Sequence, residues 1–256
     1  MRFCVFGSSS AKTPQKYLEV ARSLGREIAG AGHDAVTGGG QFGCMMGAQQ
    51  GCIEAGGEVI YVVHQKFIDG GSVDINANGV KEVICAQGDD LTERKRLLVD
   101  YSDAIMICPG GVGTFDEFWD IVSHKSLSMK GLNEKPIVVL NFDGFYDGFI
   151  EQLRRAGEDG LLYLETSKFF MVTPSPAEAV KMATKYVEDV KSNGAEDLGR
   201  TRTKSGDNKL KAGSNKGKGN SSFGRLKKRI DLLSLSVGIT TGAIAAVLAS
   251  QYTRKS

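Results

Sequence analysis

Ala104-Ile-Met-Ile-Cys-Pro-Gly-Gly-Val-Gly-Thr-Phe-Asp-Glu117 is the stretch of sequence that decides the fold. Its first part, Ala104–Cys108, is a short apolar run of the kind that forms a strand buried on both faces of a parallel sheet. Pro109–Thr114 is a glycine-rich turn, and a helical pattern follows it. We therefore expect a strand, a tight turn and a helix in succession. The N-terminus of the helix would point toward any ligand that binds at the turn.

Short apolar runs alternate with longer helical patterns on both sides of this stretch. The predicted strands are 2–6, 35–37, 58–63, 81–85, 104–108, 136–140 and 169–172, and the predicted helices are 15–31, 44–55, 92–101, 114–125, 144–156 and 176–190. This alternation predicts an α/β fold, with a doubly wound parallel sheet and helices on both faces. In open sheets of this class, ligands bind beyond the carboxyl ends of the strands.

Charge divides the 256 residues into two parts. Residues 1–190 contain 18 Lys or Arg and 26 Asp or Glu, whereas residues 191–256 contain 14 and 4. The first part is long enough to bury a core and forms the predicted α/β domain, with a net charge of about −8. The second part has a net charge of about +10 and is interpreted separately.

The basic part contains two predicted segments. Residues 191–229 are rich in Gly, Ser, Asn and Lys, which predicts a flexible linker. Residues 230–252 include about nineteen consecutive residues without a charge, near the length that crosses a bilayer. We interpret 230–252 as a C-terminal transmembrane anchor in an organelle outer membrane, with the domain in the cytosol. The alternative is an apolar helix that packs on the domain of a soluble cytoplasmic protein.

Cysteine and histidine usage favours a reducing compartment and no metal. The five cysteines are an odd number without a Cys-x-x-Cys pair, which indicates reduced, buried thiols. The three histidines, His33, His64 and His124, show no metal-ligand spacing. Arg2–Phe6 is too short for the apolar region of a signal peptide. We expect no metal, no cofactor and no nucleic-acid partner.

Glycine-rich turns follow three of the predicted strands: Gly7–Ser10, Gly38–Gly43 and Pro109–Thr114. Glycines let the backbone approach a phosphate, and a helix N-terminus supplies free N–H groups. The second turn matches G-x-G-x-x-G but lacks the acidic residue that dinucleotide binding requires about twenty residues later. The three turns together predict a nucleotide-phosphate site, although glycines that only permit tight turns would give the same pattern.

Two charged positions near the third turn are candidates for chemistry. Glu117 lies three residues after Thr114, and Arg94 and Lys95 lie on the predicted helix before the buried strand. A capping box between Thr114 and Glu117 is the competing interpretation of the carboxylate. A solvated surface charge run is the competing interpretation of Thr92-Glu-Arg-Lys-Arg96.

These residues carry a family resemblance that extends over residues 2–190. Four motifs resemble those of the Lonely Guy family of cytokinin riboside 5′-monophosphate phosphoribohydrolases: Thr37-Gly-Gly-Gly-x-x-Gly-x-Met-x-Gly47, Glu93-Arg-Lys95, Pro109-Gly-Gly-x-Gly-Thr-x-x-Glu117 and Leu140-Asn-Phe-Asp-Gly-Phe-Tyr146. The resemblance implies a Rossmann-like fold that is usually a homodimer. It also implies cleavage of the N-glycosidic bond of an adenine nucleotide, which gives the free base and ribose 5-phosphate.

The resemblance implies that Arg94 and Glu117 are the catalytic pair. The predicted substrate-binding residues come from the three turns and the matched motifs: Gly7, Ser8, Gly39, Gly40, Gly43, Arg94, Lys95, Gly110, Gly111, Val112, Gly113, Thr114, Phe115, Asp116 and Ser123. Cleavage at the anomeric carbon passes through an oxocarbenium-like state, which a nearby carboxylate stabilises. Members of the family also carry the label lysine decarboxylase, but no lysine here is a candidate for a Schiff base.

The sequence departs from the family pattern at Thr37, at Cys44-Met-Met-Gly47, near His124 and over 64–79. These positions are expected around the base pocket, so the departures bear on the choice of base. A general AMP nucleosidase therefore stays open, as does a non-catalytic carrier of a nucleotide or of the molybdenum cofactor. A membrane-tethered scaffold that uses the domain only for dimerisation is a third possibility.

Overall fold

A parallel sheet forms the centre of the computed structural model, which describes residues 1–129 and 131–204. Seven strands in this part pair in the order β4-β3-β2-β1-β5-β6-β7. The strands are β1 (Arg2–Phe6), β2 (Asp34–Thr37), β3 (Val59–His64), β4 (Val80–Ala86), β5 (Ala104–Ile107), β6 (Ile137–Leu140) and β7 (Met171–Thr173). The helices are α1 (Gln15–Gly30), α2 (Gly43–Glu54), α3 (Gln65–Asp69), α4 (Thr92–Asp100), α5 (Val112–Ser126), α6 (Asp147–Glu158) and α7 (Pro176–Lys204), with 3₁₀ turns η1 (Phe142–Gly144) and η2 (Thr166–Lys168).

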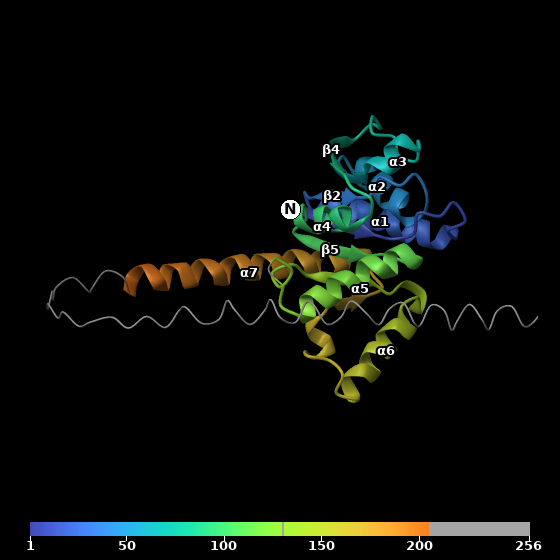
Figure 1. Cartoon of the computed structure of the whole chain (residues 1–256). Coiled ribbons are helices and arrows are strands. Elements are labelled where there is room, and N and C mark those ends of the chain that lie inside the picture. The colour runs from blue at the N-terminus through green and yellow to red at the C-terminus, as the bar shows by residue number, and fades with distance from the viewer. Residues whose placement is uncertain (130, 205–256) are drawn as a thin grey trace, which may run out of the picture. The chain divides into compact units, whose positions relative to one another are not determined.

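The two faces of the sheet bury separate apolar cores. Phe3 and Val5 of β1 pack in one core with side chains of α1, α2 and α7. Cys4 and Phe6, which alternate with them, pack in the other core with side chains of α4, α5 and α6. In Figure 1, β4, β2 and β5 follow one another from top to bottom across the sheet, in the order of their pairing. Burial on both faces explains why the strands are continuously apolar, and it confirms the predicted α/β class.

The strand order reverses between β1 and β5, which lie side by side in parallel register. The chain runs outward from β1 through β2, β3 and β4 in one direction, and from β5 through β6 and β7 in the other. The turns after the two central strands meet, because Ser8 N donates to Pro109 O at 3.0 Å. A reversal of this kind opens a crevice at the carboxyl ends of the strands, where open α/β sheets bind their ligands.

Several elements differ from the sequence predictions, α5, α3 and α7 among them. Helix α5 begins at Val112 rather than Thr114, because Gly111 takes the extended conformation of the N-cap. The short helix α3 was not predicted; the side chain of His64 caps it by accepting a hydrogen bond from Lys66 N. Helix α7 continues to Lys204 instead of ending near residue 190.

The C-terminal predictions concern residues that are described only in part. The first residues of the predicted linker, 191–204, belong to α7. The rest of that linker and the candidate anchor at 230–252 lie outside the described residues. Within the part of the chain that the structure describes, no helix combines the length and apolar character needed to cross a membrane.

Candidate active site

A cavity of about 760 Å³ opens at the carboxyl ends of β1 and β5. Its walls come from the turns after β1, β2 and β5, from the segment around α3 and from the first turn of α4. The cavity brings together most of the predicted site. The predicted residues that line it are Gly7, Ser8, Gly40, Arg94, Lys95, Gly111, Val112, Gly113, Thr114, Asp116 and Glu117.

The N-terminus of α5 forms one wall of the cavity. Residues Gly111–Thr114 line it, and the N–H groups of a first helical turn have no partner inside the helix. Gly110 is required immediately before this turn, because a Cβ there would lie 2.2 Å from Thr114 Oγ1. Free N–H groups and the positive end of the helix dipole suit an anion, and the buried Thr114 hydroxyl lies beside them.

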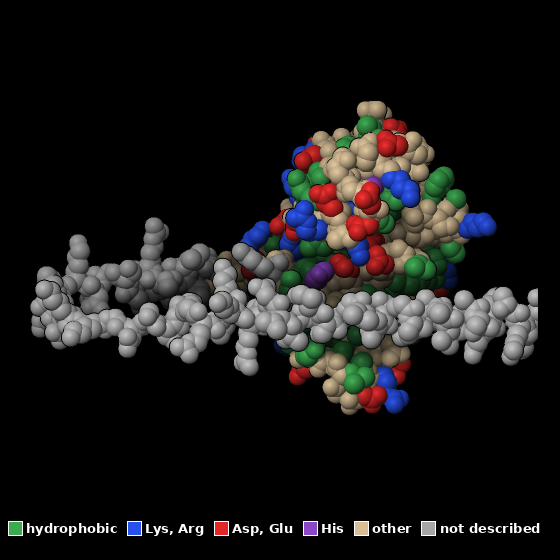
Figure 2. All heavy atoms as spheres, in the orientation of Figure 1, with side chains coloured by type: hydrophobic (Ala, Val, Ile, Leu, Met, Phe, Trp, Pro, Cys, Tyr) green, Lys and Arg blue, Asp and Glu red, His purple; other side chains and the backbone are tan. Residues whose placement is uncertain are grey.

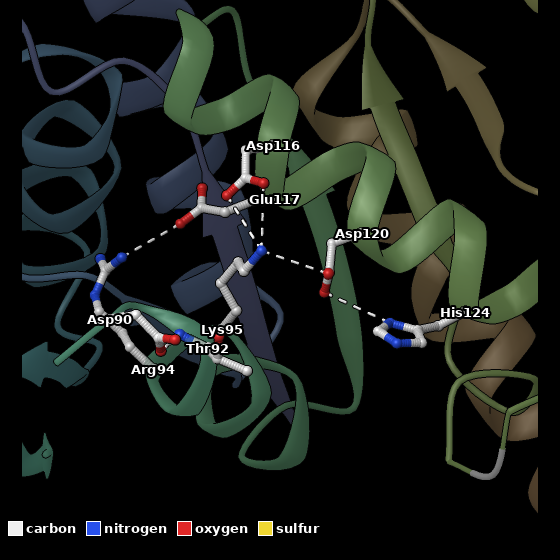
Figure 3. Close-up of polar contacts among 8 residues, drawn as sticks. All are labelled: Asp90, Thr92, Arg94, Lys95, Asp116, Glu117, Asp120 and His124. Carbon is white, nitrogen blue, oxygen red and sulfur yellow. Dashed lines mark hydrogen bonds and ion pairs between the residues drawn. The ribbon is translucent and has the colours of Figure 1, made fainter. Parts of the chain in front are cut away.

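Arg94 and Glu117 form an ion pair inside the cavity (Figure 3). Arg94 Nη1 lies 3.4 Å from Glu117 Oε1, and the two residues are only 7% and 8% exposed. Arg94 projects from α4. Its Nε donates to Val62 O of β3 at 3.2 Å, and its guanidinium lies 5.7 Å from the centre of the Phe67 ring of α3. Residues 92–96 are therefore not simply a surface charge run, because Arg94 points inward.

Burial raises the pKa of the Glu117 carboxyl to about 7, against the opposing effect of the Arg94 charge. The neighbouring Asp116 charge adds to the rise in pKa. Glu117 therefore exchanges between its charged and protonated forms near neutral pH, which suits a group that moves a proton. The capping-box interpretation of Glu117 is wrong: α5 has no side-chain cap, and Glu117 lies in its second turn.

Lys95 lies at the rim of the cavity between two carboxylates of α5. Its Nζ is 3.2 Å from Asp116 Oδ2 and 3.4 Å from Asp120 Oδ1. Asp120 Oδ2 is in turn 3.5 Å from His124 Nδ1, so polar contacts extend from Lys95 of α4 to Asp116, Asp120 and His124 of α5, as Figure 3 shows. These carboxylates hold the ammonium group at the cavity, where it adds positive charge near the N-terminus of α5.

Five predicted residues lie outside the lining of this cavity, and their packing shows why. Gly39, at a φ of +70°, packs against Val63 and Tyr61, and Gly43 lies against Ser8 O. Phe115 packs in an apolar core and Ser123 is exposed further along α5. Gly110 lines a smaller neighbouring pocket. The five are Gly39, Gly43, Gly110, Phe115 and Ser123.

Five apolar side chains form a part of the lining that we call the apolar end of the cavity, and among them only Met45 belongs to a sequence motif. The side chains that form it come from separate turns and helices: Phe42, Met45, Phe67, Val73 and Leu91. Met45, Phe67 and Val73 fall in the two segments, 44–47 and 64–79, that depart from the family pattern. The departure from the family pattern was the feature of the sequence that pointed to these three residues, and the structure places them on the wall of the cavity.

Charges on the surface of the described residues are mixed, and no metal site is evident among them. Acidic and basic side chains are interspersed over the face drawn in Figure 2. Within residues 1–129 and 131–204, no three His, Cys, Asp or Glu side chains are grouped in a way that could hold a metal ion.

Comparison with solved structures identifies the fold. The molybdenum cofactor carrier protein of Chlamydomonas reinhardtii aligns with a TM-score of 0.52 and 23% identity, over 73% of this chain and 98% of its own. The X-ray structure of TM1055 aligns with a TM-score of 0.51 and 24% identity, over 72% of this chain and 98% of its own. At this identity the likeness supports the Rossmann-like fold alone.

Sequence comparison identifies the family. The family model described as "possible lysine decarboxylase" matches residues 45–183. Cytokinin riboside 5′-monophosphate phosphoribohydrolase LOG1 of Arabidopsis thaliana is 31% identical over 73% of this chain and 84% of its own length. The enzyme of the same name, LOG, from Oryza sativa subsp. japonica is 29% identical over 73% of this chain and 74% of its own length. With these relatives and the family model covering its α/β domain, the chain belongs to the Lonely Guy family.

Proposed function

We propose that this protein hydrolyses the N-glycosidic bond of an adenine-type nucleoside 5′-monophosphate, with a cytokinin riboside 5′-monophosphate as the preferred substrate. The observation that carries the proposal is the position of the Arg94–Glu117 pair, which shares one cavity with the N-terminus of α5. An anion site and a carboxylate of raised pKa are thereby available to a single ligand. The printed activity of the curated relatives supports the same reaction.

The substrate is oriented by its two chemically different ends. The 5′-phosphate binds the N–H groups of Gly111–Thr114, with Ser8 and Lys95 on the adjoining walls. The base occupies the apolar end, between Met45, Phe67 and the side chains around them. The ribose then lies between these ends, where the carboxylate of Glu117 faces the cavity.

Hydrolysis breaks the bond between C1′ and the base nitrogen, and the bonding electron pair leaves with the base. The C1′ centre gains positive charge as the bond lengthens, and the charged form of Glu117 stabilises it. A water molecule then bonds to C1′ and gives a proton to Glu117, while the departing base takes a proton from solvent. Arg94 holds Glu117 in position and keeps part of its population ionised, by lowering its pKa against the effect of burial.

The apolar end supports an apolar substituent on the base. Phe67 offers an aromatic face, and Met45 offers a thioether whose sulfur already accepts a hydrogen bond from Gly40 N at 3.0 Å; Phe42, which also lines the cavity, is 51% exposed. A group attached to the adenine amine could bury its apolar surface there, at about 25 cal/mol per Å². Unsubstituted AMP would leave this surface in contact with water, so we propose that it is the poorer substrate.

A carrier of a nucleotide or of the molybdenum cofactor is the competing function. The solved carrier resembles this chain in fold at 23% identity. A carrier binds and releases its ligand without moving a proton, so it has no need of a buried carboxylate with a pKa near neutrality. The Arg94–Glu117 pair therefore favours the enzyme.

We propose a homodimer as the functional unit. Trp119, Ser123 and Leu127 recur at four-residue spacing along α5 and its C-cap, so they share one helix face. Trp119 is 38% exposed and Leu127 is 58% exposed. A second copy of the chain would cover this apolar surface. Light scattering of the full-length chain tests the assembly: a single protomer mass at assay concentration argues against it.

The experiment incubates the full-length protein with isopentenyladenosine 5′-monophosphate and, separately, with AMP, and measures the free base. We expect base from both nucleotides and a higher kcat/KM for the isopentenyl substrate. Base from AMP alone would remove the cytokinin assignment, and no base from either would refute the enzymatic proposal. The control is Glu117→Gln, which keeps the side-chain volume, binds nucleotide and releases no base.

A further inference from the structure

We infer that a buried hydrogen-bond network of Thr37, Gln49 and Tyr61 positions Arg94 by fixing the turn Gly38–Gly40 against its guanidinium. The inference rests on the proposed function, because Arg94 is one member of the proposed catalytic pair. None of the three network residues lines the cavity, and none belongs to the predicted site. They are therefore positioning residues rather than groups that touch the substrate.

The guanidinium of Arg94 lies close against the turn. A Cβ at Gly38 would lie 1.8 Å from Arg94 Nη2 and 3.1 Å from Arg94 Cζ. The guanidinium thus occupies the space that any other residue at this position would fill. Because the other terminal nitrogen of the guanidinium, Nη1, lies 3.4 Å from Glu117 Oε1, a shift of the turn against Nη2 would also change the geometry of the ion pair.

Hydrogen bonds from the network residues hold the turn in place. Thr37 Oγ1 accepts hydrogen bonds from Gly39 N at 3.2 Å and from Gln49 Nε2 at 3.0 Å. Gln49 Nε2 also lies 3.3 Å from Gly40 O, so the amide connects the two ends of the turn. Tyr61 OH donates to Gln49 Oε1 at 3.1 Å and fixes the orientation of that amide.

The three residues of the network are buried. Thr37 is 0%, Gln49 6% and Tyr61 4% exposed, and they belong to β2, α2 and β3. Buried polar groups depend on one another for their hydrogen bonds, because water does not reach them to replace a partner that is lost. Gly39 is at a φ of +70°, which glycine reaches without steric cost, so these bonds select one conformation of a permissive turn. Gly40 N also donates to the sulfur of Met45 at 3.0 Å, and the three network residues hold the rest of the turn from outside the cavity.

Thr37→Val tests the inference, and the chain provides a matched control. Valine keeps the shape of threonine but removes the hydroxyl that accepts from Gly39 N. Thr173 at the end of β7 is also buried, and its Oγ1 accepts from Ser175 N, two residues later, at 3.2 Å. Thr173→Val therefore removes an equivalent buried hydrogen bond at a strand end remote from the cavity.

We expect Thr37→Val to lower kcat by about 10- to 100-fold with little change in nucleotide affinity, as a displacement of about 1 Å in a catalytic group does. Thr37→Ser, which restores the hydroxyl, should recover most of this loss. Thr173→Val should leave kcat unchanged while lowering the melting temperature. A kcat for Thr37→Val equal to that of Thr173→Val would overturn the inference.

A readout without turnover separates this inference from the proposed function. The groups that face Glu117 are Arg94 and Lys95 of α4, Asp116 of its own helix and the buried Cys4 thiol of β1. Displacement of Arg94 weakens the one close positive charge, so the Glu117 pKa should rise in Thr37→Val. Carbon-13 NMR of labelled glutamate carboxyls, assigned with Glu117→Gln, measures this pKa even if the wild type releases no base.

Should Thr37→Val fail to fold, Tyr61→Phe is the second variant. It keeps the ring in the core and removes only the hydroxyl that donates to Gln49 Oε1. The expected changes are in the same direction and smaller: a lower kcat and a higher Glu117 pKa. An unchanged pKa together with an unchanged kcat would overturn the inference by this route as well.

Discussion

The stability of Glu117→Gln relative to the wild type should rise between acid and alkaline pH, and the substitution should remove activity. The wild-type carboxyl is buried beside Arg94, and its pKa is raised from the ordinary value of 4.5 to about 7. The folded state therefore binds this proton more tightly than the unfolded state does. The stability that Glu117 contributes is complete below pH 4.5 and is lost as the pH rises through 7.

The size of this effect follows from the two pKa values. Between pH 5 and pH 8, linkage predicts that ionisation of Glu117 lowers the free energy of unfolding by an amount on the order of 2 kcal/mol. Glutamine stays neutral, so the variant does not lose this amount. The difference in free energy of unfolding between Glu117→Gln and the wild type should therefore move toward the variant by a similar amount over this pH interval.

Urea denaturation of both full-length proteins at pH 5 and pH 8 measures the change. Comparison at two pH values cancels the constant cost of leaving Arg94 with an amide partner instead of a carboxylate. Glu82→Gln, an exposed position on β4, controls for the loss of one surface carboxylate. A stability difference for Glu117→Gln that stays constant from pH 5 to pH 8 would refute the assignment of a raised pKa to this group.

Three further results are expected. The wild-type kcat/KM should rise with pH, fall about tenfold for each unit below pH 7 and level off above it, because Glu117 acts in its charged form; a flat profile would contradict that role. Gly110→Ala should weaken nucleotide binding by about 1.5–3 kcal/mol, one charged hydrogen bond, by forcing the turn away from Thr114, whereas Gly148→Ala on α6 should not. Deleting residues 230–256 should move the protein from the membrane fraction to the supernatant, and an unchanged fraction would argue against the predicted anchor.

The alternation of apolar strands and helical patterns was sufficient to predict the sheet, because each element has its own local signal. The run Ala104–Ile107 forms a buried strand, and the glycine turn after it leads into α5 as predicted. The start of α5 was placed two residues too late, because Thr114 is a common N-cap residue and Gly111 took that role instead. The five-residue helix α3 has too few residues for a periodic signal, and its cap is a histidine.

The proposed phosphate-binding wall and the pairing of Arg94 with Glu117 in one site could be predicted because their residues lie in short motifs. The inward direction of Arg94 was not determined by its neighbours Glu93 and Lys95, and the motif resemblance supplied it. The apolar end of the cavity could not be predicted in the same way, because its side chains come from four separate segments that only the tertiary structure brings together. The network behind Gly38 was missed for the same reason, since Gln49 reads as an ordinary helix residue.

The most direct test of the central claim is the ratio of ribose 5-phosphate to free base formed from isopentenyladenosine 5′-monophosphate. Both products should be quantified with the full-length wild type and with Glu117→Gln, after binding of the nucleotide to each has been measured by calorimetry. We predict equal amounts of the two products with the wild type, and binding without either product for the variant. Tight binding by the wild type with neither product would contradict the claim and identify the protein as a carrier.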